Sequence, residues 1–171
     1  TDSNSNTGSA TQATALKDIV LPVVVINAVS TVNAANVSGY TVTGSCTAGD
    51  GNVSYTFASP SGGTNVTGSV ACSGGGTWTT GSISLSSLND DGAITFNANQ
   101  TDSATNTGNA TGLTAIKDAT IPVVAINAPS TANAANYTGY TIAGTCSVGD
   151  GNVSYTFASP SGGADVTGSV A

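Results

Sequence analysis

The chain has 171 residues and a formal net charge of −7, and only 6% of its residues are charged. It contains no His, Glu, Arg or Met, and its only cationic side chains are Lys17 and Lys117. This composition excludes the basic surfaces that meet nucleic-acid phosphates or anionic membranes. It also leaves any Ser or Cys nucleophile without a His base, so we expect no enzyme activity and no catalytic residues.

The sequence repeats with a period of 100 residues. Residues 1–71 match residues 101–171 at 50 of 71 positions without a gap. A period of this length suits one compact domain rather than a solenoid unit. If the Lys-Asp-x-x-x-Pro element is a linker, residues 1–17 are the tail of a preceding repeat with its last strand, residues 18–117 are a complete repeat, and residues 118–171 are the first half of the next. We therefore expect the parent chain to continue in both directions.

Short β-strands separated by turn clusters are predicted throughout the complete repeat. The longest apolar run, residues 19–26, contains Pro22 and is far below the roughly 20 residues of a membrane span. Alternating side chains place Val53, Tyr55 and Phe57 on one face, and Trp78 and Phe96 are the bulky core candidates. Seven strands in about 100 residues predict an all-β, immunoglobulin-like seven-strand sandwich, repeated in tandem. The expected strands are 20–28, 40–46, 53–58, 65–72, 77–85, 93–101 and 109–116.

Several short motifs follow one another along the repeat. Asp18 to Pro22 leads into the apolar segment VVVINA, GTW and LSSLNDDG follow at 76–78 and 85–92, and Thr101-Asp102 leads to Asn106. In this order they resemble the bacterial immunoglobulin-like tandem repeats of giant adhesins and biofilm-associated surface proteins. The resemblance covers the whole chain. It implies an extracellular or cell-surface spacer or fibre that supports adhesion or biofilm formation. Its partners would be neighbouring repeats of the same chain and other copies in a fibre.

Two other functions stay open at this level. One is a surface-layer, sheath or filament subunit, because a sandwich of low charge with Thr, Ser and Asn on its faces can pack laterally. The other is a carbohydrate-binding module, which requires exposed aromatic side chains. The aromatic candidates are few, and we expect the last of them to be buried: Tyr40, Tyr137, Tyr140 and Trp78.

The positions of the three cysteines fit the 100-residue repeat. Cys46 and Cys72 both fall on the inward parity of their expected strands, and Cys146 repeats Cys46. We predict a Cys46–Cys72 disulfide formed in an oxidising compartment, with Cys146 pairing to a Cys beyond residue 171. The alternative is two buried free thiols. A zinc site is disfavoured because the chain has no His and no Cys-x-x-Cys pair.

Aspartate and asparagine residues gather in three segments that alternating strands would bring to one end of the repeat. These are the linker, the loop before residue 53 and the loop after residue 101. Ca²⁺ takes 6–8 oxygen ligands of this kind, and the resemblance implies calcium between neighbouring repeats. The alternative is that these residues are ordinary turn formers that bond their own backbone. The candidate ligands, including their counterparts in the next repeat, are Asp18, Asp50, Asn52, Asp102, Asn106, Asp118 and Asp150.

The remaining charged residues have simpler expected roles. Lys17 and Lys117 each precede a linker aspartate, and we expect both to be solvated, since an exposed ion pair is worth at most about 1 kcal/mol. Asp90 and Asp91 fall in the loop before the strand expected at 93–101, near the exit of the repeat.

Overall fold

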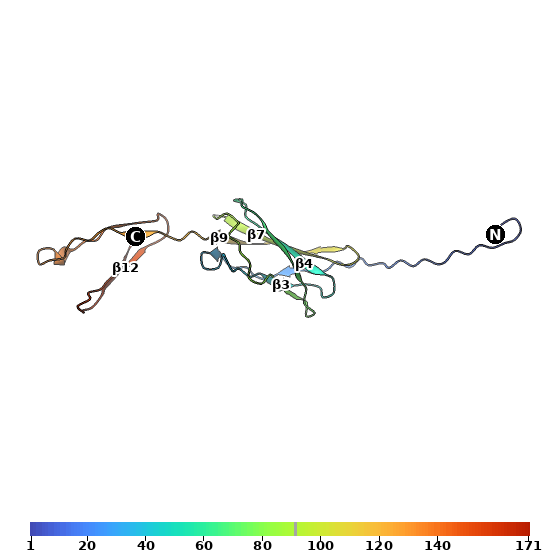
Figure 1. The fold of residues 1–171 in the computed structure, drawn as a ribbon, viewed down its shortest axis with the longest axis horizontal. Coiled ribbons are helices and arrows are strands. Elements are labelled where there is room, and N and C mark those ends of the chain that lie inside the picture. Colours follow the sequence, from blue (N-terminus) through green and yellow to red (C-terminus); the bar gives the residue numbers. More distant parts are fainter. Residues whose placement is uncertain (91) are drawn as a thin grey trace. The chain divides into compact units, whose positions relative to one another are not determined.

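The computed structural model describes residues 1–90 and 92–171, so the predicted position of Asp91 lies outside the described residues. The described chain is all-β apart from one short 3-10 helix, and it divides into two compact units, Thr1–Ala119 (unit 1) and Thr120–Ala171 (unit 2) (Figure 1). None of the helices in the described residues has the length and hydrophobicity needed to span a bilayer.

Unit 1 is built from two sheets. One has the strand order β1-β3-β6, and the other has the order β2-β9-β7-β4-β5, with β8 added on β7. The short β2 runs parallel to β9, whereas the other pairs are antiparallel. The strands are β1 (Val25–Ile26), β2 (Val32–Asn33), β3 (Thr43–Ser45), β4 (Asn52–Ala58), β5 (Val66–Ala71), β6 (Thr77–Thr79), β7 (Gly92–Thr101), β8 (Thr107–Asn109) and β9 (Leu113–Asp118).

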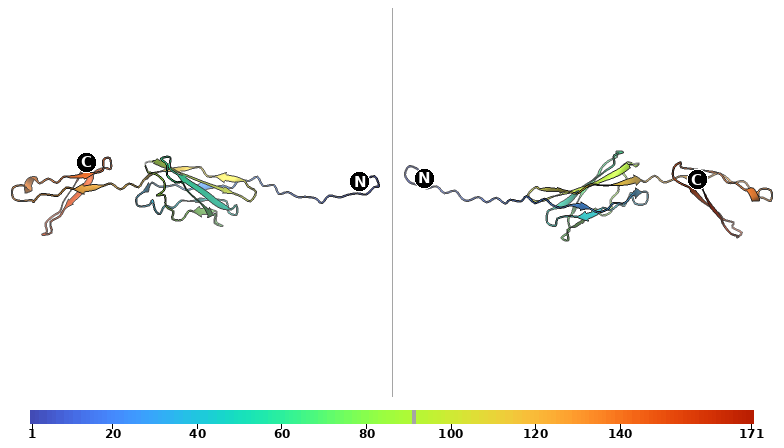
Figure 2. Two further views of the ribbon diagram at one scale, coloured as in Figure 1. Left: turned by 45° about the horizontal axis from the view of Figure 1, so that its top comes forward. Right: turned by 180° about the vertical axis from the view of Figure 1, so that it is seen from behind.

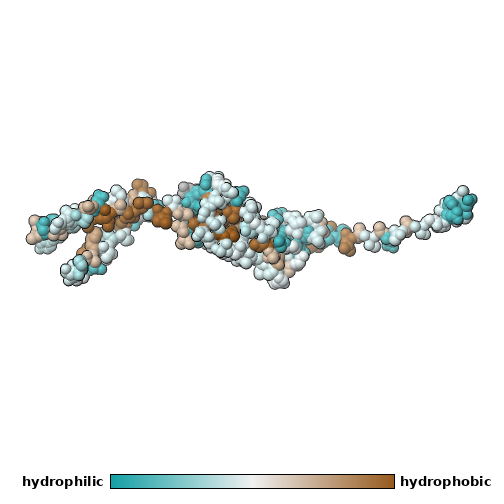
Figure 3. All heavy atoms as spheres, viewed as in Figure 1, coloured by the Kyte–Doolittle hydropathy of each residue, from teal (hydrophilic) through white to brown (hydrophobic). Residues whose placement is uncertain are grey.

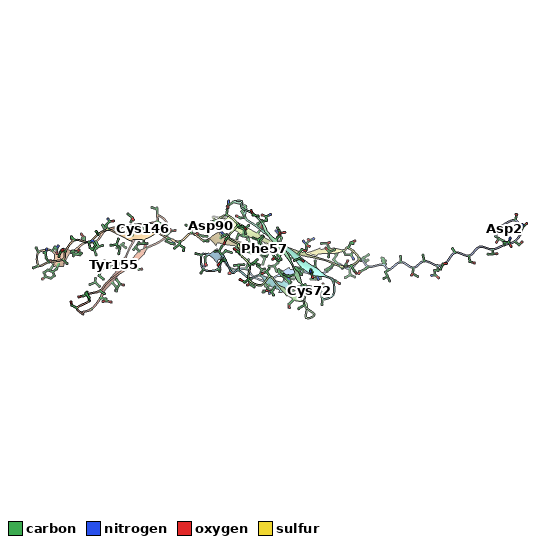
Figure 4. All side chains as sticks on the ribbon, in the orientation of Figure 1. Asp2, Phe57, Cys72, Asp90, Cys146 and Tyr155 are labelled. Carbon is green, nitrogen blue, oxygen red and sulfur yellow. A yellow bond between two sulfur atoms is a disulfide. The ribbon has the colours of Figure 1, made fainter. Side chains whose placement is uncertain are left out.

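The two sheets share one apolar core. Inward residues of β4 and β7 alternate with outward polar ones, as period-2 strands require, and Phe57 lies inside the unit (Figure 4). Phe57 and Phe96 are fully buried with ring centroids 4.9 Å apart, and Trp78 from the opposite sheet is 3% exposed. Figure 2 shows the strands of this unit in two further views. Burial of Trp78 agrees with the sequence-based expectation.

A glycine makes room for the tryptophan. Gly44 lies opposite Trp78 in the β3–β6 pair, and a Cβ on Gly44 would come within 2.4 Å of the indole Nε1 and 1.9 Å of the Val25 carbonyl. The indole N–H donates to that same Val25 carbonyl at 3.1 Å. Gly44 therefore lets Trp78 close the core and satisfy its only polar group at once.

The strand boundaries differ from the expected ones where a side-chain hydrogen bond or a bulge interrupts the regular backbone pairing. The strand expected at 77–85 ends at Thr79, because the Thr80 hydroxyl takes the place of a backbone acceptor for the Val42 N–H at 3.0 Å. The strand expected at 109–116 divides into β8 and β9, because three residues (110–112) face two (97–98) on β7, which is a bulge. The first expected strand, 20–28, shortens to β1, and β2 had no counterpart among the expected strands.

Lys117 corrects the expectation that both lysines are solvated. Its residue is 3% exposed, and its ammonium group forms an ion pair with the Asp90 carboxylate. The cause is the parity of β9, which turns positions 113, 115 and 117 toward the core and leaves Ile116 exposed. The aliphatic stem of Lys117 therefore lies in the core while its charge is neutralised at the rim. Lys17, which occupies the same place in the repeat, is exposed.

Unit 2 repeats the first half of unit 1. It contains β10 (Val124–Ile126), a 3-10 helix η1 (Tyr137–Gly139), β11 (Gly144–Cys146), β12 (Val153–Phe157) and β13 (Val166–Val170). Its described strands form two separate two-stranded sheets, β10-β11 and β12-β13. Apolar side chains of these strands reach the surface, seen as brown spheres along this unit in Figure 3, and Ile126 is 64% exposed.

Candidate functional site at the polar end of unit 1

The loop from Asp102 to Asn106 closes on itself through its aspartate. The Asp102 carboxylate accepts hydrogen bonds from the Ala104 N–H (2.8 Å), the Asn106 N–H (2.9 Å) and the Asn106 side-chain amide (2.8 Å). The backbone adds bonds between Asp102 and Asn106 and between Thr105 and Asp102, with Thr105 at φ 71°. This is the arrangement of an Asp-headed turn that satisfies its own backbone donors.

These contacts set the acidity of Asp102. The side-chain amide of Asn106 makes the largest contribution, and burial opposes it. Together with the backbone donors of Asn106, Ala104 and Thr105, the amide holds the pKa of Asp102 below its ordinary value of 3.8. Hydrogen bonds to the charged form lower a carboxylate pKa in this way. Asp102 is therefore a carboxylate at neutral pH, and its charge is used within the loop.

The same loop forms a second time near the N-terminus, in residues that belong to no strand. The Asp2 carboxylate accepts from the backbone N–H groups of Asn4 and Asn6 and from the Asn6 amide at 2.9–3.0 Å, and Ser5 has φ 67°. The hydrogen bond from the Asn6 amide again leads the causes that lower the pKa of Asp2. Asp2 is fully exposed, so the loop geometry is set by its own five residues.

The loop headed by Asp102 also holds the linker in place. The Asn106 amide also donates to the Asp18 backbone carbonyl at 3.3 Å, and the Asp18 carboxylate accepts from the Val20 N–H at 3.1 Å. Gly108 approaches so closely that a Cβ there would lie 1.7 Å from the Pro22 carbonyl oxygen. Two of the three segments predicted to converge, the linker and the loop after β7, thus meet at this end.

Gln100 joins the third segment to the same end, and the sequence-based reasoning missed it. Its side chain is fully buried and makes three hydrogen bonds, accepting from the Thr47 N–H and donating to the Thr47 and Gly51 carbonyls at 2.9–3.0 Å. It therefore fixes the loop between β3 and β4. The available signal was a polar residue at an inward position of β7, in line with Ile94, Phe96 and Ala98.

The remaining predicted ligands are Asp50, Asn52, Asp118 and Asp150. Asp50 is half-buried in the β3–β4 loop, and Asn52 is exposed at the start of β4. Asp118 is an exposed residue at the end of β9, opposite Asn33, and Asp150 is exposed in unit 2. Across the described residues, no three His, Cys, Asp or Glu side chains come together in an arrangement that could hold a metal ion.

The geometry of this end fits hydrogen-bonded turns. The carboxylates of Asp102 and Asp18 accept hydrogen bonds from backbone N–H groups of their own loops, as turn-forming aspartates do. Calcium at the joint between repeats stays a prediction, and a melting experiment described below tests it.

A disulfide joins the two sheets near this end. Cys46 follows β3 and Cys72 follows β5, and the structure contains a bond between them, with Cα atoms 6.0 Å apart. This is the pair predicted from the sequence. Since β3 and β5 belong to different sheets, the bond links the two sheets of the sandwich covalently. Cys146 is free and exposed, and its pairing with a cysteine beyond residue 171 stays a prediction.

The chain was compared with known proteins. No protein-family model and no curated protein matches it. Among solved structures it is similar to one titled "Crystal structure of tetra-tandem repeat in extending region of large adhesion protein", with 22% sequence identity and a TM-score of 0.45. The match covers 86% of this chain and 37% of that chain, so the present chain spans little more than a third of that structure's length.

Proposed function

We propose that this chain is a structural spacer or fibre segment of an extracellular or cell-surface adhesin, built from immunoglobulin-like repeats and without enzyme activity. The observation that carries the proposal is that the chain builds the same local structure twice. The β4–β5 and β12–β13 hairpins have the same register, with Val53 opposite Val70 and Val153 opposite Val170. Near-identical modules provide length, whereas a unique binding site does not need them.

The disulfide supports a location outside the cytoplasm. Disulfides persist in oxidising compartments and are rare where glutathione and thioredoxin keep thiols reduced. In unit 1 the Cys46–Cys72 bond is a covalent link between the two sheets, since it joins the ends of β3 and β5. An extracellular stalk gains from such a bond because its domains must stay folded under load.

The strand order of unit 1 suits resistance to pulling. β2 lies in the N-terminal part of the unit and β9 at its end, and the two are parallel, with Val32 opposite Lys117. When the ends of the unit are pulled apart, two parallel strands attached to opposite ends are loaded along their common axis. Their hydrogen bonds are then strained together instead of one by one, and the disulfide confines any extension of residues 46–72.

Single-molecule stretching of the chain between fixed handles tests this function. We expect a distinct unfolding event of unit 1 in the oxidised protein. After reduction, the extension released by that event should grow by about 8–9 nm, because the disulfide spans 26 residues at about 3.5 Å each. Unfolding without measurable resistance under both conditions would contradict a load-bearing role.

A calcium titration addresses the predicted metal at the joint. The thermal unfolding of unit 1 can be followed through Trp78, which is the only tryptophan of the chain. Melts in excess Ca²⁺ and in chelator should differ by several degrees if calcium holds the linker to the loops after β3 and β7. Identical melts would leave Asp18, Asp50 and Asp102 as turn residues and the rigidity of the unit to packing and the disulfide.

The carbohydrate-binding alternative finds less support. Tyr40 is 4% exposed, and its hydroxyl bonds the Ser30 backbone, while Trp78 is buried in the core. Tyr140 is half-buried, and Tyr137 alone among the four aromatic candidates is well exposed, at 69%. Sugar-binding sites stack sugar rings on exposed aromatic faces, so a single exposed tyrosine on a 3-10 helix offers little surface for such stacking. Saturable binding to an immobilised glycan, lost in Tyr137→Ala, would favour this alternative.

A further inference from the structure

We propose that the Lys117 amine and the Asp90 carboxyl group condense to an amide, which cross-links β9 covalently to the loop before β7. The inference concerns a modification of the chain and goes beyond the spacer function. It is read out by chain mass and protease cleavage, so its failure would leave the result of the stretching experiment unchanged.

The Lys117 amine is enclosed within unit 1. Its strand, β9, is an inner strand of the larger sheet, and Lys117 lies opposite Gly92 of β7 on one side and Val32 of β2 on the other. The Lys117 side chain is only 4% exposed, and its amine contacts the Asp90 carboxylate, whose side chain is 25% exposed. A nucleophilic nitrogen is thus held against a carboxyl group where little water reaches it.

The backbone beside Asp90 is fixed by its own set of hydrogen bonds. The Asn89 N–H donates to the Gly62 carbonyl at 3.0 Å, and the Asn89 carbonyl accepts from the Ser59 hydroxyl at 3.1 Å. The Asn89 side-chain amide donates to the Ser61 carbonyl at 2.8 Å. Asp90 lies at the end of unit 1 at which β9 ends (Figure 4). Its carboxylate is therefore positioned independently of the lysine that it meets.

This geometry favours a reaction that is unfavourable between free molecules. In solution, water reverses the condensation of an amine with a carboxylic acid. Two groups held in contact on fixed backbones react with effective molarities of about 10⁵–10⁸ M, because their translational and rotational freedom is already lost. Such a value far exceeds the concentration of liquid water, so the amide of Lys117 and Asp90 is favoured over the separate groups.

The condensation needs no other reactant. The Lys117 ammonium first passes one proton to the Asp90 carboxylate, which gives a neutral amine and a carboxylic acid. The amine lone pair then forms a bond to the Asp90 Cγ, and the bond from Cγ to the hydroxyl oxygen breaks. The hydroxyl group leaves as water with a proton taken from the nitrogen. One amide and one water molecule are formed, and nothing is oxidised or reduced.

An ion pair by itself gives little reason for a lysine at this position. Two charges lose their hydration when they are buried, and apolar residues in place of a buried ion pair are often equally or more stabilising. The chain has two lysines and no arginine among its 171 residues. One of those two lysines nevertheless occupies an inward position of β9. An amide removes both charges and gives the buried amine a chemical role.

The cross-link would close a loop around the end of unit 1. Residues 90 and 117 are 27 positions apart, and β8, most of β7 and most of β9 lie between them. A pull on the chain after residue 117 would reach the loop before β7 through the amide. β9 would then stay attached to the unit even if its hydrogen bonds to β2 were broken. The Cys46–Cys72 bond would close a second, separate loop.

Trypsin digestion of the reduced and unfolded chain tests the proposal. Trypsin cleaves after Lys and Arg, and the two lysines of this chain have matched surroundings, Lys17-Asp18 and Lys117-Asp118. Lys17 is exposed and serves as the internal control. We expect complete cleavage after Lys17 and none after Lys117, together with an intact mass lower than the sequence mass by one water molecule. Cleavage after both lysines with the full mass would overturn the proposal.

Three variants locate the bond. Lys117→Arg keeps a cation beside Asp90 but lacks the amine, so cleavage at position 117 and the full mass should return. Asp90→Ala removes the carboxyl group and should have the same two effects. Asp165→Ala, at an exposed position of unit 2, should keep the water loss and the resistance at Lys117. Resistance at Lys117 that persists in Asp90→Ala would overturn the proposal.

Water can also be lost at an Asp-Gly pair such as Asp50-Gly51, through a succinimide. A succinimide leaves Lys117 open to trypsin and is hydrolysed in mild base, whereas the amide survives both treatments. Tandem mass spectrometry of a chymotryptic digest should find one branched peptide that joins Asp90 to Lys117. Water loss with normal cleavage at Lys117, or a branch to another carboxylate, would contradict the proposal.

Discussion

Residues 18–71 and 118–171 are two versions of one sequence in two different surroundings. They are identical at 39 of 54 positions. In unit 1 the first version lies under β6, β7 and β9 and buries Val24, Ile26 and Phe57. In unit 2 the second version has no such cover among the described residues, and its equivalent side chains are exposed. The difference in burial therefore comes from the cover that β6, β7 and β9 provide in unit 1, and hardly from sequence differences between the two versions.

Local structure is nevertheless the same in both versions. The Asn36 side chain accepts from the Asn33 N–H at 2.8 Å, and Asn136 does the same for Asn133. Both hairpins keep their register, and both glycines of each Gly-Asp-Gly turn have positive φ, at Gly49, Gly51, Gly149 and Gly151. Turns and hairpins of this chain are thus set by neighbours in sequence, whereas the core depends on strands that follow many residues later.

The largest predicted effect contrasts Phe57 with Phe157. Phe57→Ala should destabilise unit 1 by about 3–5 kcal/mol, since it leaves a cavity beside Phe96. Phe157→Ala should change that stability by less than about 0.5 kcal/mol because Phe157 is partly exposed in the other unit. Denaturant unfolding followed by Trp78 fluorescence measures both. Equal losses for the two variants would mean that the surroundings of the two phenylalanines do not differ.

The next effect contrasts the paired and the free cysteines. Replacing Cys46 and Cys72 together by Ser should lower the stability of unit 1 by about 3–4 kcal/mol in the chain-entropy model for a loop of 26 residues. Cys146→Ser should leave it unchanged. Thermal melts of oxidised protein under non-reducing conditions provide the comparison. A stability loss for Cys146→Ser would show that this cysteine takes part in the fold of unit 1.

A smaller effect concerns the buried amide. Gln100→Leu keeps the volume but leaves the Thr47 N–H and two carbonyls without partners, so it should cost about 1–3 kcal/mol. Asn97→Leu, at an exposed position of the same strand, is the control and should cost less than about 0.5 kcal/mol. Hydrogen exchange should also quicken at Thr47 in the first variant only. An unchanged Thr47 amide would argue against the role of Gln100 in holding its loop.

The smallest effect is a pH dependence that separates Asp102 from Asp2. The folded-state pKa of Asp102 is depressed, so the stabilisation it provides is complete above the ordinary value of 3.8 and is lost as pH falls through the lower folded value. Asp102→Asn should reduce this acid sensitivity in the melts of unit 1. The pKa of Asp2 is also lowered, but its loop lies in the exposed N-terminal residues, so Asp2→Asn should leave the melts unchanged. Chemical shifts recorded from pH 2 to 6 report both carboxylates directly.

From the amino-acid sequence alone we could predict the all-β character, the repetition, the cysteine pair and the alternation of β4 and β7. These follow from residue-level rules, namely period-2 patterning, turn-forming Gly and Asn clusters and inward cysteine parity. The convergence of the linker with the loop after β7 also followed from strand alternation, and the contact between Asn106 and Asp18 realises it.

Three other features of unit 1 depend on long-range contacts and could not be predicted in this way. The burial of Lys117 beside Asp90, the three bonds of Gln100 and the parallel pairing of β2 with β9 all join residues far apart in the chain. No local pattern encodes such contacts, because their free energy depends on which groups the closed core leaves next to each other. The same reason explains why one sequence buries its apolar face in unit 1 and exposes it in unit 2.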